Sequence, residues 1–162
     1  MTDASPWAVS LVNAGRWFAQ PSLTIAGLAA LALVPVGMVW AMLDHRLIHR
    51  EMVAIKPIKF ALSIGVYLLT VSWMLGYVRA ERLTSFPVRA ATLGLLGGAA
   101  VELLCIVLQA ARGRRSHFNT STPMDAAISA TMGIMVILFV GMLLPLAWEV
   151  ARWPRPGAAP RR

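Results

Sequence analysis

The stretch LTIAGLAALALVPVGMVWAML (residues 23–43) runs for 21 residues without a charge. A helix needs about 20 apolar residues to cross the hydrocarbon core of a bilayer, so this stretch predicts a transmembrane helix. Residues 60–78 and 126–148 are also uncharged, and residues 90–111 carry only Glu102. The sequence therefore predicts an all-α, integral membrane four-helix bundle with spans at 22–43, 58–79, 88–111 and 124–148.

The composition supports a membrane protein and gives no sign of a nucleic-acid partner. The chain is 58% hydrophobic and 14% charged, whereas about a quarter of the residues in a soluble domain are charged. The net charge is +8, but the basic residues flank the apolar runs and form no basic module with stacking aromatics. This placement predicts contact with membrane lipids through their anionic headgroups, and no binding of nucleic acid.

The two ends of the chain differ from the spans between them. Residues 5–19 place Trp7, Leu11, Ala14 and Phe18 at helical spacing, which predicts a short interfacial helix. Residues 152–162, RWPRPGAAPRR, are rich in proline and arginine and predict a disordered basic tail. Residues 1–151 are then expected to form a single transmembrane domain.

Four spans place the loop between the first two helices and the loop between the last two on one side of the membrane. We call this side the histidine face, because it holds His45, His49 and His117, the three histidines of the chain. Lysines and arginines are divided almost evenly between the two sides, eight against seven, so the positive-inside rule does not decide the orientation.

Polar residues recur at helical spacing in the second and third spans. Lys59, Ser63 and Tyr67 share one side of the second span, while Glu102 and Gln109 share one side of the third. We expect both stripes to face the bundle interior, with Glu102 and Tyr67 meeting near the midplane. An intramembrane carboxylate is functional by default, and the structural alternative is a protonated Glu102 that bonds Tyr67 or a neighbouring hydroxyl and fixes two helices in register.

The loop between the third and fourth spans reads Arg112-Gly-Arg-Arg115-Ser116-His117-Phe-Asn119. Arginines beside serine, histidine and asparagine are suited to clamp a phosphate or carboxylate, although lipid anchoring explains the arginines alone. The candidate polar site comprises Glu102, Tyr67, Gln109, Lys59, Ser63, Arg112, Arg115, Ser116, His117 and Asn119.

The histidines offer a weaker alternative. His45 and His49 are four residues apart, so on a helix they would share a face and bind a metal with His117 as the third ligand. A solvated helix end with mixed charges explains the same residues, and the question of a cofactor stays open. Asp125 is expected to act in a helix cap, because Thr122-Pro-Met-Asp125 has the spacing of a capping box.

The segments KPIKFALS (56–63) and QAARGRRSHFN (109–119) resemble signature segments of a family of uncharacterised bacterial small four-helix membrane proteins. The resemblance implies a location in the bacterial inner membrane and carries over no activity or catalytic residue.

Three classes of function fit the sequence. The first is an integral membrane protein that binds, or acts on, an amphipathic and anionic small molecule or lipid through a polar site on the histidine face. The second is a structural or lipid-binding subunit of a larger homo- or hetero-oligomeric membrane assembly. The third is a proton or ion pathway that uses Glu102. Whether the protein is an enzyme stays open.

Overall fold

The structure is a computed structural model that describes residues 18–48 and 50–154. Its four long helices are α2 (Pro21–Leu43), α3 (Ile55–Leu75), α4 (Phe86–Ala111) and α5 (Pro123–Arg152). Between them lie a two-stranded hairpin, β1 (Leu47–Ile48) and β2 (Glu51–Met52), and a short 3₁₀ helix, η1 (Ala80–Arg82). The predicted all-α four-helix architecture is confirmed, while most of the predicted interfacial helix and residues 155–162 of the predicted tail lie outside the described residues.

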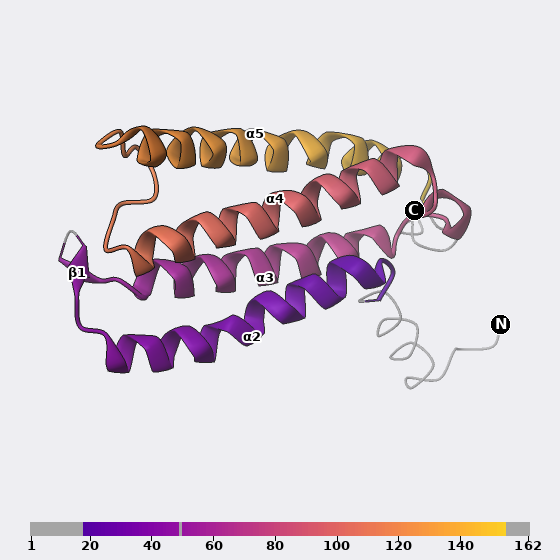
Figure 1. Cartoon of the computed structure of the whole chain (residues 1–162). Coiled ribbons are helices and arrows are strands. Elements are labelled where there is room, and N and C mark those ends of the chain that lie inside the picture. Colours follow the sequence, from indigo (N-terminus) through magenta and orange to yellow (C-terminus); the bar gives the residue numbers. More distant parts are fainter. Residues whose placement is uncertain (1–17, 49, 155–162) are drawn as a thin grey trace.

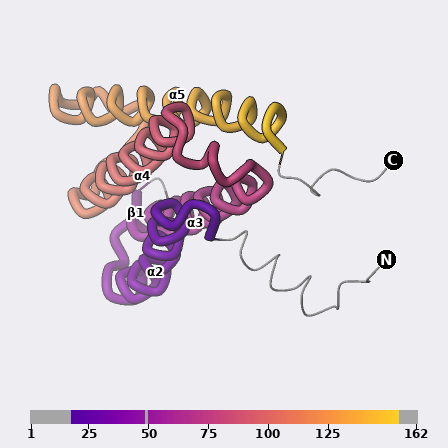
Figure 2. Tube along the Cα trace, turned by 90° about the vertical axis from the view of Figure 1, so that its right-hand side faces the viewer, coloured from indigo at the N-terminus to yellow at the C-terminus, as the bar shows by residue number. Residues whose placement is uncertain are grey.

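The helices form two antiparallel pairs joined in the middle. α2 packs closely on α3 and α4 on α5, and the contact of α3 with α4 joins the two pairs. Figures 1 and 2 show α2 and α5 at opposite edges, with α3 and α4 between them. The buried core runs along the inner helices and includes Leu68, Leu75, Leu95 and Ala99.

All four helices are long and apolar enough to cross a membrane, and the protein is an integral membrane protein. Large apolar side chains such as Ile25, Met42, Leu93 and Leu144 are exposed on its outer surface. In water such a surface would be unfavourable, but in a bilayer it faces acyl chains of equal polarity.

Local chemistry accounts for most helix boundaries. Proline occupies the first turn of α2, α4 and α5, where its missing N–H breaks no helical hydrogen bond. Thr122 caps α5 by accepting a hydrogen bond from the Asp125 N–H at 3.1 Å, as the capping-box spacing predicts. α3 begins at Ile55 and ends at Leu75, so it begins three residues and ends four residues earlier than the predicted 58–79.

The C-terminal end of α5 differs from its prediction. The helix continues to Arg152, four residues beyond the predicted span, and residues 152–154 do not belong to a disordered tail. The Arg79 N–H donates to the Trp153 carbonyl at 3.1 Å, and Val78 pairs with Pro154 in a β-bridge. These backbone contacts fix the end of α5 against the loop that follows α3.

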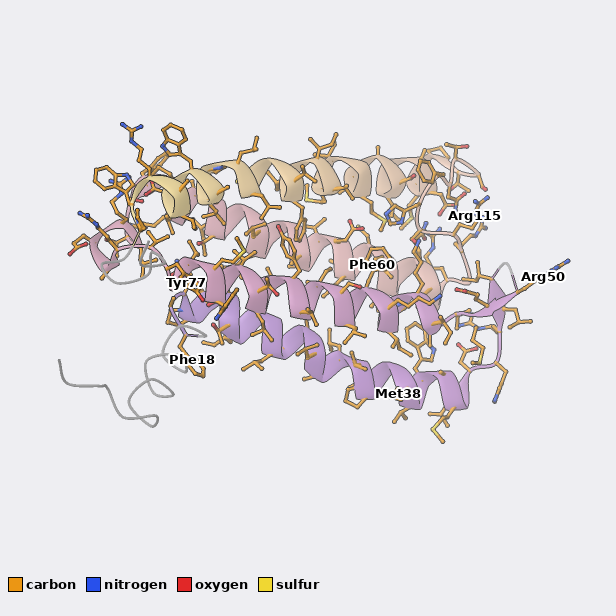
Figure 3. The ribbon with its side chains drawn as sticks, turned by 180° about the vertical axis from the view of Figure 1, so that it is seen from behind. Phe18, Met38, Arg50, Phe60, Tyr77 and Arg115 are labelled. Carbon is orange, nitrogen blue, oxygen red and sulfur yellow. The ribbon has the colours of Figure 1, made fainter. Side chains whose placement is uncertain are left out.

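The two ends of the bundle carry different groups. The hairpin and the loop between α4 and α5 lie at one end (Figure 1), and Figure 3 shows Arg50 and Arg115 there, with Phe18 and Tyr77 at the other end. The histidine face is therefore a single surface, opposite the η1 end.

This arrangement predicts which loops are accessible from one side of the membrane. In a Cys105→Ser background, a single cysteine at Thr84 and one at Thr120 should lie on opposite sides, because α4 separates them. Both residues are exposed, so an impermeant thiol reagent should label one position in sealed vesicles and both after permeabilisation. Labelling of both cysteines in sealed vesicles would rule out this topology.

Candidate functional site

Part of the loop between α4 and α5 folds inward, while Arg115, Phe118 and Thr120 stay exposed. Ser116 and Asn119 are buried, and Phe118 adopts a left-handed backbone conformation with φ 53° that turns the chain after His117. The Arg115 carbonyl accepts hydrogen bonds from Asn119 Nδ2 at 3.0 Å and from Gln109 Nε2 at 3.1 Å. These bonds hold the loop against the end of α4 and direct His117 toward the bundle interior.

Lys56 in the first turn of α3 contacts two residues of this loop. Its ammonium nitrogen Nζ donates to Ser116 Oγ and lies 2.9 Å from His117 Nδ1. Ser116 Oγ is itself 3.3 Å from His117 Nδ1. Residues that are 60 positions apart in the sequence therefore form one polar cluster, which we call the Lys56 cluster: Lys56, Ser116 and His117.

The imidazole of His117 also reaches Glu102. His117 Nε2 lies 3.3 Å from Glu102 Oε1, at the distance of an ion pair but outside the geometry of a hydrogen bond. Glu102 is only 4% exposed, and neither carboxylate oxygen has a hydrogen-bond partner in the described part of the chain. Glu102 is ten residues before Arg112, about 15 Å along α4, and the inward fold of the loop brings His117 down to it.

The surroundings of His117 favour its neutral form. Burial lowers the pKa of His117 from its ordinary value, and repulsion from the Lys56 ammonium lowers it further. The ring is therefore neutral at pH 7, with one N–H. Since Lys56 donates toward Nδ1, we assign the proton to Nε2, on the side of Glu102.

The Lys56 cluster faces a cavity of about 310 Å³ on the histidine face. The hairpin, α3, α4 and the loop all contribute to its wall, and its charged lining residues are Glu51, Lys56, Arg114 and Arg115. Glu51 pairs with Lys59 at 2.9 Å, and Arg114 contacts Asp125 at 3.5 Å. Lys56 and Arg115 form no ion pair within the described residues, so the cavity carries an excess of positive charge.

A second cavity of about 310 Å³ lies between α3, α4 and α5. Its wall is mostly apolar, with Phe60, Ile64, Val136 and Phe139 among its residues, and Glu102 is the one carboxylate among the described residues that line it. The ring of Phe60 also contacts His117, with centroids 5.9 Å apart. Phe60 and His117 therefore separate the cationic cavity from this apolar groove.

The predicted pair of Glu102 and Tyr67 shares the apolar groove but forms no hydrogen bond. Tyr67 Oη, like the Glu102 carboxylate, is buried without a hydrogen-bond partner among the described residues. The Tyr67 ring packs against Phe139 with centroids 5.3 Å apart, and this contact fixes the ring. The structural alternative, in which these two groups fasten the helices together, is therefore not what the structure shows.

The polar stripe of α3 faces the interior at Tyr67, whose hydroxyl is buried, but not at Lys59 and Ser63, in contrast to the prediction. Lys59, Ser63 and Thr70 are exposed, because α3 buries its opposite side, including Leu68, against α2. Ser63 and Thr70 donate to the backbone carbonyls four residues earlier, at 2.8 Å each, so neither hydroxyl needs a partner on another helix. Helical spacing establishes that residues share a face but does not establish which face is buried.

Gln109 and Arg112 belong to a hydrogen-bond network around Asp125. Asp125 therefore does more than take part in the predicted helix cap. Asp125 Oδ1 accepts from Gln109 Nε2 at 2.9 Å and from Arg112 at 3.1 Å, and its carboxylate is fully buried. Arg112 also donates to Gln109 Oε1 at 2.6 Å. The network joins the end of α4 to the start of α5 and supports the loop that carries His117.

The residues that follow α2 are extended and not helical, so the metal alternative loses the shared helix face on which it depends. α2 ends at Leu43, and Asp44 is extended, accepting hydrogen bonds from Trp40 at 3.0 Å and from Arg46. The Arg46 guanidinium holds the pKa of Asp44 well below its ordinary value. His45 is exposed, His49 lies outside the described residues, and the residues that are described contain no group of three metal-ligand side chains.

The opposite end contains an ion pair that sequence reasoning did not find. Arg82 donates to both carboxylate oxygens of Glu149, at 2.9 and 2.6 Å, and Glu149 is 2% exposed. The guanidinium also lies over the Trp153 ring, 5.3 Å from its centroid. The only signal for it in the sequence is Glu149 itself, an acidic residue that directly follows the apolar run of residues 126–148.

Comparison with known proteins adds no assignment to this geometry. No protein-family model, no curated protein and no solved structure matches the chain.

Proposed function

We propose that this protein binds an anionic amphiphile, with the charged head in the cationic cavity of the histidine face and an apolar chain beside it in the membrane. The observation that carries the proposal is the pair of Lys56 and Arg115, two cations at one cavity that form no ion pair among the described residues. Like charges at close range repel, and an anion between them removes the repulsion.

The chemistry of the cavity fits a phosphate or a carboxylate. Lys56 supplies an ammonium, Arg115 a guanidinium fork and Ser116 a hydroxyl, all of which bond oxyanions. Lys56 already donates to Ser116 and His117, so the cluster is ordered before an anion arrives. A preorganised cluster loses less side-chain entropy on binding than free surface lysines do.

The apolar groove supports the second half of the proposal. It adjoins the cavity across Phe60 and His117, and a further apolar cavity of about 280 Å³ between α3 and α5 shares Tyr67 with it. Together these cavities extend along α3 toward Leu75, near the opposite end of the bundle. A hydrocarbon chain would find apolar walls along this route.

The resemblance of residues 56–63 and 109–119 to signature segments of bacterial membrane proteins supports the choice of binding residues and the proposed location. Lys56 and Ser116, which the structure brings together, come from these two segments. The same resemblance supports a location in the bacterial inner membrane, where anionic lipids supply ligands of this class.

The test is retention of the ligand by variants purified in a mild detergent. Arg115→Gln and Lys56→Met should each lower affinity about tenfold or more, because a charged hydrogen bond contributes about 1.5–3 kcal/mol. Native mass spectrometry with added dioleoyl phosphatidylglycerol in one arm and oleate in the other measures the affinity and separates phosphate from carboxylate.

The matched control is Arg89→Gln, which removes an exposed cation at the opposite end of the bundle. Arg115 is exposed as well, so its replacement should leave the fold intact. Equal affinity in the wild type and all three variants would leave the cations as general membrane anchors and contradict the proposal.

A further inference from the structure

We propose that His117 is a proton shuttle, which carries protons between the cationic cavity on the histidine face and the buried carboxylate of Glu102. The inference concerns a different activity from ligand binding and rests on a separate observation: one imidazole ring has polar partners in two compartments.

The two ring nitrogens of His117 face two different cavities. Nδ1 lies 2.9 Å from Lys56 Nζ, on the side of the cavity, and Nε2 lies 3.3 Å from Glu102 Oε1, on the side of the apolar groove. Phe60 packs against the ring and lines the groove, so it closes the space beside the imidazole. A histidine is the side chain that can accept a proton at one nitrogen while it releases one from the other.

Glu102 is the terminal group of this path. Glu102 is 4% exposed, and its carboxylate has no hydrogen-bond partner among the described residues. It lines the apolar groove with Tyr67, whose hydroxyl is equally unpartnered there. A buried acid that serves only to fasten helices would be expected to have its hydrogen bonds satisfied.

The transfer balances as follows. The Lys56 ammonium gives a proton to His117 Nδ1 and recovers one from a hydronium ion of the aqueous phase, which becomes water. The ring, now protonated at both nitrogens, releases the Nε2 proton to the Glu102 carboxylate and becomes neutral again with its proton on Nδ1. Unloading is the reverse sequence, so the ring needs no rotation between loading and unloading.

The charges around the His117 ring disfavour its doubly protonated form. Arg114, Arg115 and Glu51 face the cavity side, from the loop and from the hairpin, and Lys56 faces it from α3. Glu102 faces the ring from α4. The cations disfavour a lasting imidazolium, so a proton accepted by the ring is passed on and not stored.

The experiment follows protonation of Glu102 by its infrared carboxyl band after a rapid pH jump, in protein purified and reconstituted in neutral-lipid nanodiscs. Disappearance of the band in Glu102→Gln assigns it. His117→Ala should slow the appearance of the band at least tenfold without removing it, and added imidazole should restore the rate. Rescue by a free base is a result that a purely structural role of His117 would not give.

His45→Ala is the matched control, since His45 is an exposed histidine on the same face. His117→Gln, which keeps a polar side chain of similar length, tests whether loss of packing explains the slower rate. An unchanged rate in His117→Ala, a slow rate that imidazole does not restore, or a Glu102 band that never changes with pH would each overturn the proposal. Ligand affinity, measured separately, decides the binding proposal whatever this result.

Discussion

Replacing Gly65 by leucine should push α3 away from α2 and lower the free energy of unfolding by about 1–3 kcal/mol or more. A Cβ atom at Gly65 would lie 2.7 Å from Leu31 Cγ and 2.9 Å from the Gly27 carbonyl oxygen. The carbonyl belongs to the backbone of α2, so rotation of a side chain cannot relieve the clash. Denaturation by sodium dodecyl sulfate in mixed micelles measures the loss.

Gly97→Leu provides the control, because a Cβ atom at Gly97 meets nothing within 4 Å. Both variants add the same apolar volume to a transmembrane helix. Similar denaturation midpoints for Gly65→Leu and Gly97→Leu would mean that α2 and α3 do not approach as closely as the structure places them.

Replacing Asp125 by leucine should both destabilise the protein and abolish binding of the anionic amphiphile. The change removes the acceptor of Gln109 Nε2 and the carboxylate partner of Arg112 and Arg114. Gln109 also holds the Arg115 carbonyl, so its release frees the loop that positions Ser116 and His117. Asp125→Asn, which keeps the shape and an acceptor oxygen, should give a smaller effect on both properties.

Thr122→Ala separates the network from the helix cap. It removes the hydroxyl that accepts from the Asp125 N–H, at a cost of about 0.5–2 kcal/mol, and leaves the arginine contacts in place. Thr122→Ala should therefore retain the ligand with reduced thermal stability. Full ligand binding by Asp125→Leu would show that the loop does not depend on this network.

Helix number and most boundaries could be predicted because they depend on local properties of the sequence. Runs of about 20 apolar residues define spans, and prolines such as Pro21, Pro87 and Pro123 are compatible with the first turn of a helix. The same local logic predicted the Thr122 cap. These features need no information about neighbouring helices.

The interior of the site could not be predicted, because it depends on which helix faces which. The close contact of Gly27 with Gly65 turns the polar side of α3 away from α2, and this exposes Ser63. The inward fold of the loop depends on the bonds to the Arg115 carbonyl and on a left-handed phenylalanine, Phe118. Neither feature has a signature at the level of residue spacing.

The sequence places Lys56 and Lys59 together as cations of the histidine face, but only Lys59 is among the predicted residues of the candidate polar site. Lys56 and Lys59 both flank Pro57, and the stripe along α3 favoured Lys59. In the structure Lys59 is exposed and pairs with Glu51, while Lys56 turns toward the loop and contacts Ser116. A difference of three residues decides which cation reaches the cavity.

The two lysines also allow the most direct test of the central claim, that an anionic head binds at Lys56. They are the only lysines in the chain, so ¹⁵N-lysine labelling gives two side-chain signals, which Lys56→Arg and Lys59→Arg assign. Solid-state NMR dephasing of these signals measures proximity to ³¹P of phosphatidylglycerol or to ¹³C-carboxyl oleate in separate samples. The account predicts dephasing of the Lys56 signal by one of the two ligands and little dephasing of Lys59, whereas equal dephasing of both lysines, or of neither, would contradict it.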